Sequence, residues 1–245
     1  MYLKHLHPDQ LRDAVTRGLP LLVPAGCIEC HGPHLPLGHD TLLVEEICAR
    51  VAQEVECVIA PSFDYGPTGY AVSGPEMGTL DPDYTAFGLY VKSLLRAFCE
   101  MGFRTIVVII LHQGMEAPLA LAFKKAAAEL AFELALEKRS RGWWGERPLS
   151  AEENREFWSR IHVRPLILPA ASPPASGDHG GYYETSFLLA TRPELVDQGK
   201  LDQHAPWYCH LGEEKSSATA HAEQGRTMVE ACVRAWVEEL QRLGP

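Results

Sequence analysis

The chain has 245 residues, 46% of them hydrophobic and 22% charged, which is enough for one globular domain over residues 1–245 with a substantial buried core. Its formal net charge of −10 argues against nucleic acid as a partner, and no run of about 18 apolar residues suggests a membrane span. The N-terminus lacks the apolar segment of a signal peptide, so we expect a cytoplasmic protein whose seven cysteines are reduced.

The first hundred residues alternate short apolar runs with amphipathic stretches, which indicates strands and helices in turn. We expect a buried strand at residues 19–24, a helix at 41–54 and a second strand at 57–60. Residues 62–80 are rich in Gly, Pro, Ser and Tyr and predict a long loop, a feature that inside a domain usually serves function. Asp81, followed by a proline, is the expected N-cap of a helix that ends near Met101.

The second half of the chain continues this alternation. Residues 105–111, TIVVIIL, predict a central parallel strand that is covered on both faces. Helices are expected at 117–138 and 218–243, whereas residues 139–165 show no clear period. The alternation favours an α/β fold with a mainly parallel sheet, in which sites gather at the carboxyl ends of the strands.

Polar side chains follow two of the predicted strands. Glu29 and His31 lie two residues apart after the first strand, so they point the same way from an extended segment, and Asp40 follows nine residues later. His112 comes directly after the strand at 105–111. Carboxylates and imidazoles bind divalent metals such as zinc, so these residues are candidate ligands. The alternatives are ordinary polar loop residues and, for His112, a hydrogen-bonded histidine at the edge of the core.

A third polar segment is residues 179–186, HGGYYETS. The glycines beside His179 allow backbone and ligand to approach closely. Glu184 falls in the first turn of a predicted helix, from which a carboxylate can still reach a metal. The segment therefore serves as a helix start, as part of a site, or as both.

The segment 27–31, CIECH, also matches a motif of a different class of protein. It matches the C-x-x-C-H signature of c-type haem attachment and contains a C-x-x-C pair that is typical of redox sites. Because the chain shows no export signal, we expect Cys27 and Cys30 to be neither haem-linked nor disulfide-bonded. A redox or haem protein built on Cys27, Cys30 and His31 remains an alternative.

Together these segments resemble the signature of the creatininase (creatinine amidohydrolase) family. Residues 23–41, VPAGCIECHGPHLPLGHDT, are similar to its P-x-G-x-x-E-Q-H-G-P-H-L-P-L-x-T-D-T stretch. Residues 111–114, LHQG, resemble its N-G-H-G-G-N after a strand, and residues 179–186 its H-A-G-x-x-E-T-S. The resemblance implies a three-layer α/β/α fold and a homo-oligomer such as a hexamer. It also implies two divalent ions per chain (Zn, Mn or Fe), which activate water to hydrolyse a non-peptide C–N bond in a small cyclic amide or formamide.

The resemblance also implies roles for individual residues. The residues that match metal ligands are Glu29, His31, Asp40 and His112. Of these, Asp40 matches the ligand that bridges the two ions. Glu184 matches a glutamate near the metals and His179 a histidine that transfers protons, so the resemblance marks both as catalytic. Glu184 is a candidate metal ligand as well.

Two departures from the family pattern affect this interpretation. Cys30 stands where the family usually has glutamine, and Gly114 stands where creatininase carries a glutamate that serves its second metal. Glu184 is a candidate to complete the second site. The alternative is a catalytically silent, metal-binding member of the family with a structural or binding role.

Aromatic and basic residues suggest a preference for an acidic substrate other than creatinine. Tyr65 and Tyr70 are expected to form a wall for a small planar ligand. The segment 139–165 adds tryptophans and arginines that are suited to a ring with a carboxylate or phosphate, namely Trp143, Trp144, Trp158, Arg139, Arg141 and Arg147. The alternative is that the tryptophans pack an oligomer interface.

Overall fold

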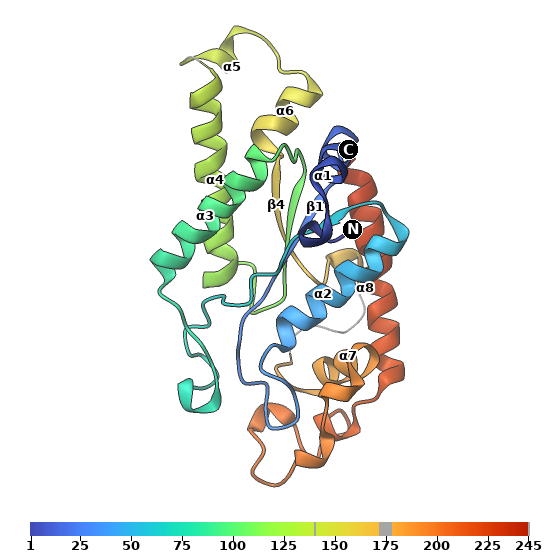
Figure 1. The fold of residues 1–245 in the computed structure, drawn as a ribbon. Coiled ribbons are helices and arrows are strands. Elements are labelled where there is room, and N and C mark those ends of the chain that lie inside the picture. The colour runs from blue at the N-terminus through green and yellow to red at the C-terminus, as the bar shows by residue number, and fades with distance from the viewer. Residues whose placement is uncertain (140, 172–177, 245) are drawn as a thin grey trace.

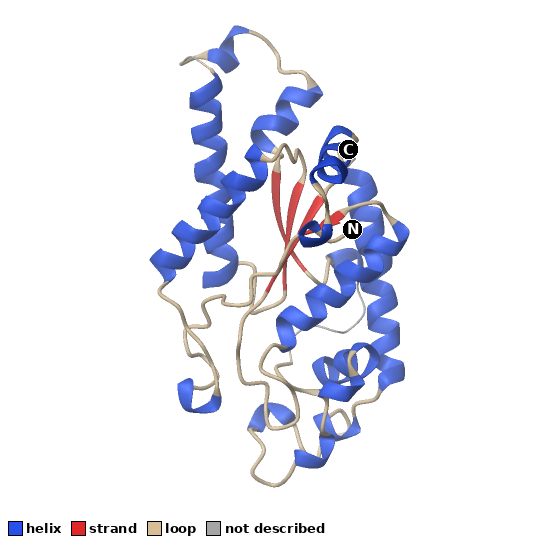
Figure 2. Ribbon diagram, in the orientation of Figure 1, coloured by secondary structure: helices blue, strands red, loops and turns tan. Residues whose placement is uncertain are grey.

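A four-stranded parallel sheet forms the centre of the computed structural model, which describes residues 1–139, 141–171 and 178–244 (Figures 1 and 2). The strands are β1 (Leu21–Ala25), β2 (Val58–Ile59), β3 (Ile106–Ile110) and β4 (Ile161–Pro165). Their order across the sheet is β2-β1-β3-β4. β1 and β3 pair along their whole length, from Leu21 beside Ile106 to Ala25 beside Ile110, so their carboxyl ends lie side by side.

Every residue of β1 and β3 is buried, as the continuous apolar runs predict for a strand covered on both faces. Successive side chains of a strand point to opposite faces. Val23 and Val108 belong to one apolar core, whereas Leu22 and Val107 belong to a second core on the other face. The sheet therefore separates two cores, each closed by its own helices.

Helices cover both faces of the sheet (Figure 1). One face is covered by α1 (Pro8–Thr16), α3 (Tyr84–Glu100) and α4 (Pro118–Lys138), and the other by α2 (His39–Glu54), α7 (Tyr182–Thr191) and α8 (Ala222–Leu243). The predicted three-layer α/β/α fold is confirmed. Among the helices that the structure describes, none is long and apolar enough to cross a membrane.

The predicted role of Asp81 as a helix N-cap is wrong. Helix α3 begins at Tyr84, and its N-cap is Asp83, whose carboxylate accepts a hydrogen bond from the backbone N–H of Ala86. Asp81 instead accepts hydrogen bonds from the backbone N–H groups of Thr68 and Gly69. It therefore anchors the 62–80 loop rather than starting the helix.

The segment 139–165, which has no clear period, contains more structure than its sequence indicates. Within it lie α5 (Trp143–Glu146), α6 (Ala151–Trp158) and β4. Helix α6 starts with a capping box, in which Ser150 and Glu153 each bind the backbone N–H of the other. Short elements such as α5, α6 and β4 lack the repeats that make longer ones recognisable.

The last helix begins later than predicted, because α8 starts at Ala222 rather than near residue 218.

The order of the strands locates a crevice at one end of the sheet. From β1 the chain passes to β2 on one side, whereas β3 and β4 lie on the other side. In parallel α/β sheets, ligands bind beyond the carboxyl ends of the strands where the order reverses in this way. Here that point lies between β1 and β3, and the polar segments after Ala25 and Ile110 both lead into it.

Trp236 on α8 tests how this end of the sheet is held. The side chain is fully buried, and its Nε1–H donates to the carbonyl oxygen of Leu166, 2.8 Å away, just after β4. Trp236→Phe leaves that buried carbonyl unpaired, so we expect the free energy of unfolding to fall by about 1–3 kcal/mol. Trp207→Phe is the matched control, because Trp207 is 83% exposed. Urea denaturation followed by circular dichroism measures both, and equal midpoints would contradict the prediction.

Candidate metal centre

The loop after β1 is fixed by close backbone contacts. A Cβ at Gly26 would lie 2.7 Å from the backbone nitrogen of Thr41, so only glycine allows the strand to end against the start of α2. Farther along, the N–H of Glu29 donates to the carbonyl oxygen of Leu37 at 2.9 Å. These contacts bury Glu29 and His31, each 1% exposed, at the carboxyl end of the sheet.

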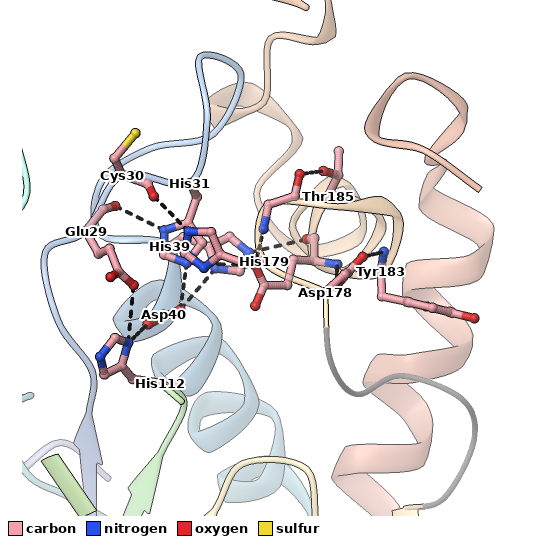
Figure 3. A network of polar contacts seen from close by, with 12 residues as sticks. Glu29, Cys30, His31, His39, Asp40, His112, Asp178, His179, Tyr183 and Thr185 are labelled. Carbon is pink, nitrogen blue, oxygen red and sulfur yellow. Dashed lines mark hydrogen bonds and ion pairs between the residues drawn. The ribbon is translucent and has the colours of Figure 1, made fainter. Parts of the chain in front are cut away.

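Asp40, in the first turn of α2, lies between two groups of potential ligands (Figure 3). One carboxylate oxygen, Oδ2, is 3.1 Å from Nδ1 of His112, which follows β3. The other oxygen, Oδ1, is 3.1 Å from Nε2 of His31. The two oxygens of one buried carboxylate thus face two different groups.

The first group consists of Cys27, Glu29, Asp40 and His112, whose ligand atoms all lie within 4.8 Å of one another. Nδ1 of His112 lies 3.4 Å from Oε2 of Glu29 and 3.2 Å from Sγ of Cys27. All four side chains are buried. The pairing of β1 with β3 produces this group, because it places residues 27–29 beside residue 112.

The second group consists of His31, His39, Asp40 and Glu184, also within 4.8 Å of one another. Oε2 of Glu184 lies 3.8 Å from Nε2 of His31, and Nδ1 of His39 lies 3.3 Å from Oδ1 of Asp40. Glu184 comes from the first turn of α7, as the sequence predicts. Docking of α7 therefore completes this group.

Backbone carbonyls fix the orientation of two of these histidines. Nδ1 of His31 lies 3.0 Å from the carbonyl oxygen of Glu29, and Nε2 of His39 lies 3.3 Å from that of Glu184. A carbonyl only accepts, so these ring nitrogens carry the hydrogens. The opposite nitrogens face Asp40, and fixing one ring nitrogen on a carbonyl in this way is how proteins commonly orient metal-binding histidines.

The segment before α7 is anchored to the rest of the site. The carboxylate of Asp178 accepts from the backbone N–H groups of Tyr183, at 2.6 Å, and Glu184, at 3.3 Å, and so caps the helix. Nε2 of His34 lies 2.8 Å from Oγ1 of Thr185, which joins the loop after β1 to α7. These bonds hold the Glu184 carboxylate at the end of the sheet.

The site concentrates buried charge. Burial opposes the charge of Asp40, but His31 and His112 hold the pKa of its carboxyl well below the usual range. Burial likewise opposes protonation of His112, yet hydrogen bonds to Asp40 and Glu29 raise its pKa to about 9. Burial raises the pKa of Glu184 to about 8, and the carboxylates of Asp40 and Asp178 add to the shift, although His31 opposes it. Carboxylates this close favour a cation among them.

Unpaired polar atoms in the site also indicate a bound cation. Oε1 of Glu29 and Nε2 of His112 are buried with no hydrogen-bond partner in the described part of the chain. Such atoms are rare in folded proteins, since leaving one unsatisfied costs about 1–3 kcal/mol. Imidazole, carboxylate and thiol groups together are also the donor set of divalent zinc and related ions. The residues present therefore fit a divalent metal.

His179 lies beside these groups and has an oriented ring. Its ring stacks on that of His31, with the centroids 4.2 Å apart. Nε2 lies 2.8 Å from the carbonyl oxygen of Cys30, so this nitrogen carries a hydrogen. Burial lowers the pKa of His179, and the neighbouring His31 adds to that effect. The neutral ring therefore leaves Nδ1 as the nitrogen that is free to exchange a proton.

A cavity of about 460 Å³ opens onto both groups. Its polar wall includes His112, His179, Tyr183 and Glu184. Its apolar lining includes Val72, Leu111, Ile167, Phe187 and Met228. No lysine or arginine occurs among the described residues that line it. The cavity is therefore of a size for a small molecule and carries an acidic wall.

The predicted tyrosine wall is wrong. Tyr65 is 64% exposed and Tyr70 is 46% exposed, and neither lines the cavity. The 62–80 loop contributes Ala71 and Val72 instead. Hydrogen bonds with Asp81 and Gln113 fix the backbone of this loop at Thr68 and Gly69, so its composition alone does not decide which residues face the cavity.

The predicted contacts of tryptophans and arginines with a substrate are also wrong within this chain. Trp143 and Trp158 stack on each other, with the centroids 6.2 Å apart, in the segment that precedes β4. Arg139 and Arg147 both bind Glu153. This segment leads into the amino end of β4, whereas the cavity lies at the carboxyl ends of the strands (Figure 1).

The structure brings together all six residues that the sequence analysis marks: Glu29, His31, Asp40, His112, His179 and Glu184. Three further residues of the site were missed: Cys27, His39 and Asp178. A signal existed for His39, which immediately precedes Asp40 at a position where the family signature has threonine. Neither Cys27 nor Cys30 forms a disulfide bond in this structure.

Comparison with known proteins agrees with this arrangement. Residues 4–240 match the model of the creatininase family, described as creatinine amidohydrolase. The chain belongs to the creatininase family. A creatinine amidohydrolase of Pseudomonas putida is 25% identical over 250 residues, 92% of this chain and 90% of that protein. A 3-dehydro-scyllo-inosose hydrolase of Thermotoga maritima is 26% identical over 244 residues, 91% of this chain and 73% of that protein.

Solved structures of the family share the fold. A crystal structure of creatinine amidohydrolase (creatininase) superposes with a TM-score of 0.76 at 22% identity, and the match covers 100% of this chain and 98% of the other. A manganese form of creatininase superposes with a TM-score of 0.73 at 22% identity, over 100% of this chain and 99% of the other. Family membership identifies the chain as a hydrolase, whereas its relatives differ in the substrates that their names give.

Substitution of Gly180 tests how closely residues 179–186 must approach the loop after β1. Its φ is +59°, and a Cβ there would lie 2.4 Å from the carbonyl oxygen of His31. We expect Gly180→Ala to destabilise the protein by about 1–3 kcal/mol or more, because it strains the backbone and separates α7 from His31. Gly114→Ala is the matched control, since a Cβ there meets nothing within 4 Å. The melting temperatures of both variants are compared with that of the wild type. The prediction fails if Gly180→Ala unfolds at the same temperature as the wild type and Gly114→Ala.

Proposed function

We propose that the chain, as one domain over residues 1–245, is a metal-dependent hydrolase of a non-peptide C–N amide bond in a small molecule. Glu29, Asp40 and His112 would hold one ion, and His31, Asp40 and Glu184 would hold the other. The observation that carries the proposal is the placement of Asp40, whose Oδ2 and Oδ1 lie 3.1 Å from His112 and His31 respectively. A carboxylate with its oxygens in two ligand groups is suited to bridge two ions.

Glu184 offers the second site a carboxylate that Gly114 does not have. Gly114 has no side chain to offer, and the space around its missing Cβ is empty to 4 Å. The Glu184 carboxylate instead belongs to the second ligand group, and its Oε2 accepts from the N–H of Gly180 at 2.7 Å. A carboxylate from α7 thus supplies what the residue after β3 lacks. This arrangement favours an active hydrolase over a silent family member.

Zinc and manganese are the ions that we expect. Solved relatives include a manganese form of creatininase and a zinc–zinc form of one of its variants. When bound, divalent ions of this kind polarise an amide carbonyl and lower the pKa of water that they share. The mixture of imidazole and carboxylate ligands is compatible with either ion.

The residues of this chain then orient the substrate and move protons. The departing nitrogen of an amide must be protonated, because an amide anion is a poor leaving group. His179 lines the cavity, and Nε2 is held by the carbonyl oxygen of Cys30, so Nδ1 is the atom that takes up and delivers the proton. Stacking on His31 holds the ring in place beside the ligand groups.

The lining of the cavity favours a neutral or cationic substrate. The ions would neutralise Glu29, Asp40 and Glu184, which leaves Asp178 as the other acidic residue of the lining, and no described lining residue is lysine or arginine. A carboxylated or phosphorylated amide would therefore lack a cationic side chain to pair with. The apolar wall suits a small ring, as in a lactam or another cyclic amide.

The proposed function is tested by metal content and turnover together. Protein purified without added metal is loaded with zinc or manganese, and the metal per chain is measured along with hydrolysis of creatinine, neutral lactams, formamides and acidic analogues. We expect up to two ions per chain and turnover of a neutral or cationic amide. Asp40→Ala should lose both ions, whereas Glu184→Gln should lose one. Full metal occupancy in Asp40→Ala, or full occupancy of wild type with no turnover of any amide, would contradict the proposal.

The role of His179 is tested by separating kcat from metal content. His179→Ala should lower kcat by about 10²–10⁴-fold, the range for a lost general acid, while the metal content stays at the wild-type level. The control is His210→Ala, because His210 is not among the residues that line the cavity. Loss of an ion in His179→Ala would show that His179 is a ligand, which its position beside Glu29 and His31 also permits.

A further inference from the structure

Cys27 is the member of the first ligand group to which the proposed function gives no role. It lies two residues beyond β1 and is fully buried. Its Sγ is 3.3 Å from Oδ2 of Asp40 and 3.2 Å from Nδ1 of His112. The sulfur thus contacts the same two atoms that face the first ion in the proposed function.

The other cysteines next to this loop and in the core have different surroundings. Cys48 and Cys232 pack in the apolar core between the sheet, α2 and α8. Figure 3 shows the sulfur of Cys30 pointing away from Asp40 and His112. The contact of Cys27 with potential metal ligands is therefore not a general consequence of burying a thiol in this fold.

The spacing of the four donors fits their binding to a single ion. Metal–ligand bonds of about 2.0–2.3 Å, typical of zinc, place the corners of a tetrahedron roughly 3.3–3.8 Å apart. Here the distances from His112 Nδ1 to Cys27 Sγ, Asp40 Oδ2 and Glu29 Oε2 are 3.2, 3.1 and 3.4 Å. The distance between Sγ and Oδ2 of Asp40 is 3.3 Å. Four edges of the group thus come close to the lengths that one bound ion requires.

A second observation also indicates a ligand at this place. Oε1 of Glu29 is buried, with the residue 1% exposed, and has no hydrogen-bond partner among the described residues. Its carboxylate belongs to the same group as the Cys27 sulfur. An ion between Glu29, Cys27 and the other two residues would satisfy this carboxylate, which a hydrogen-bonded thiol alone does not do.

We propose that Cys27 binds the first ion through its sulfur, as a fourth protein ligand beside Glu29, Asp40 and His112. The inference rests on the proposed function, since it needs a metal at this site. On binding, the thiol hydrogen leaves to solvent and the thiolate takes its place on the ion. A thiolate is a soft ligand that favours zinc or cobalt over manganese or magnesium. Cys27 therefore makes the first site selective for the softer ions.

Cobalt substitution tests the bond directly. Metal-free protein is titrated with Co²⁺, and a thiolate on cobalt gives a charge-transfer band in the near ultraviolet that carboxylate and imidazole ligands do not give. We expect the band in wild type and in Cys30→Ser, but not in Cys27→Ser. Cys30→Ser is the matched control, because it removes a buried thiol three residues away that does not face the group.

Metal retention gives a readout that is independent of both turnover and spectrum. Under competition with a chelator, Cys27→Ser should hold zinc at least about tenfold more weakly than wild type, on the scale known for perturbed metal sites, while manganese retention changes little. Cobalt bound by wild type without the band, or a band that survives in Cys27→Ser, would overturn the inference and leave the proposed function standing. Failure of wild type to bind any divalent ion would overturn both.

Discussion

The buried carboxylate of Asp40 is the constraint on which the rest of the site depends. A charge removed from water in this way is tolerated only when it is paired and hydrogen-bonded. His31, His39 and His112 each place a ring nitrogen within 3.3 Å of this carboxylate, and they come from three different parts of the chain. The loop after β1, the first turn of α2 and the end of β3 must therefore meet in one geometry.

Glycine and hydrogen-bonded anchors make that meeting sterically feasible. Gly26 allows β1 to end against α2, and Gly180 brings the segment before α7 against the backbone of His31. Asp178 then caps α7, and His34 holds Thr185 of the same helix. The second ligand group thus depends on contacts made by residues that are not proposed metal ligands. Changes to such residues alter the site without removing any of its donors.

Long apolar runs made the fold predictable, whereas short elements depended on context. β1, β3 and α4 follow from sequence patterns, because a strand buried on both faces and a long helix each repeat a clear signal. The start of α3 was misplaced, because Asp81 and Asp83 are both chemically able to cap a helix. Only the loop that binds Asp81 excludes it from that role.

The sequence by itself determined the donor types, their order along the chain and the strands that precede them, because these follow from local composition and a family signature. Only the tertiary structure decided which donors share a group. It placed the Glu184 carboxylate in the second group, added Cys27 and His39, and kept the tryptophans of the 139–165 segment away from the cavity. The physical reason is that contacts between residues as distant as His39 and Glu184 arise from the packing of α2 and α7 across one core, which spacing along the chain does not encode.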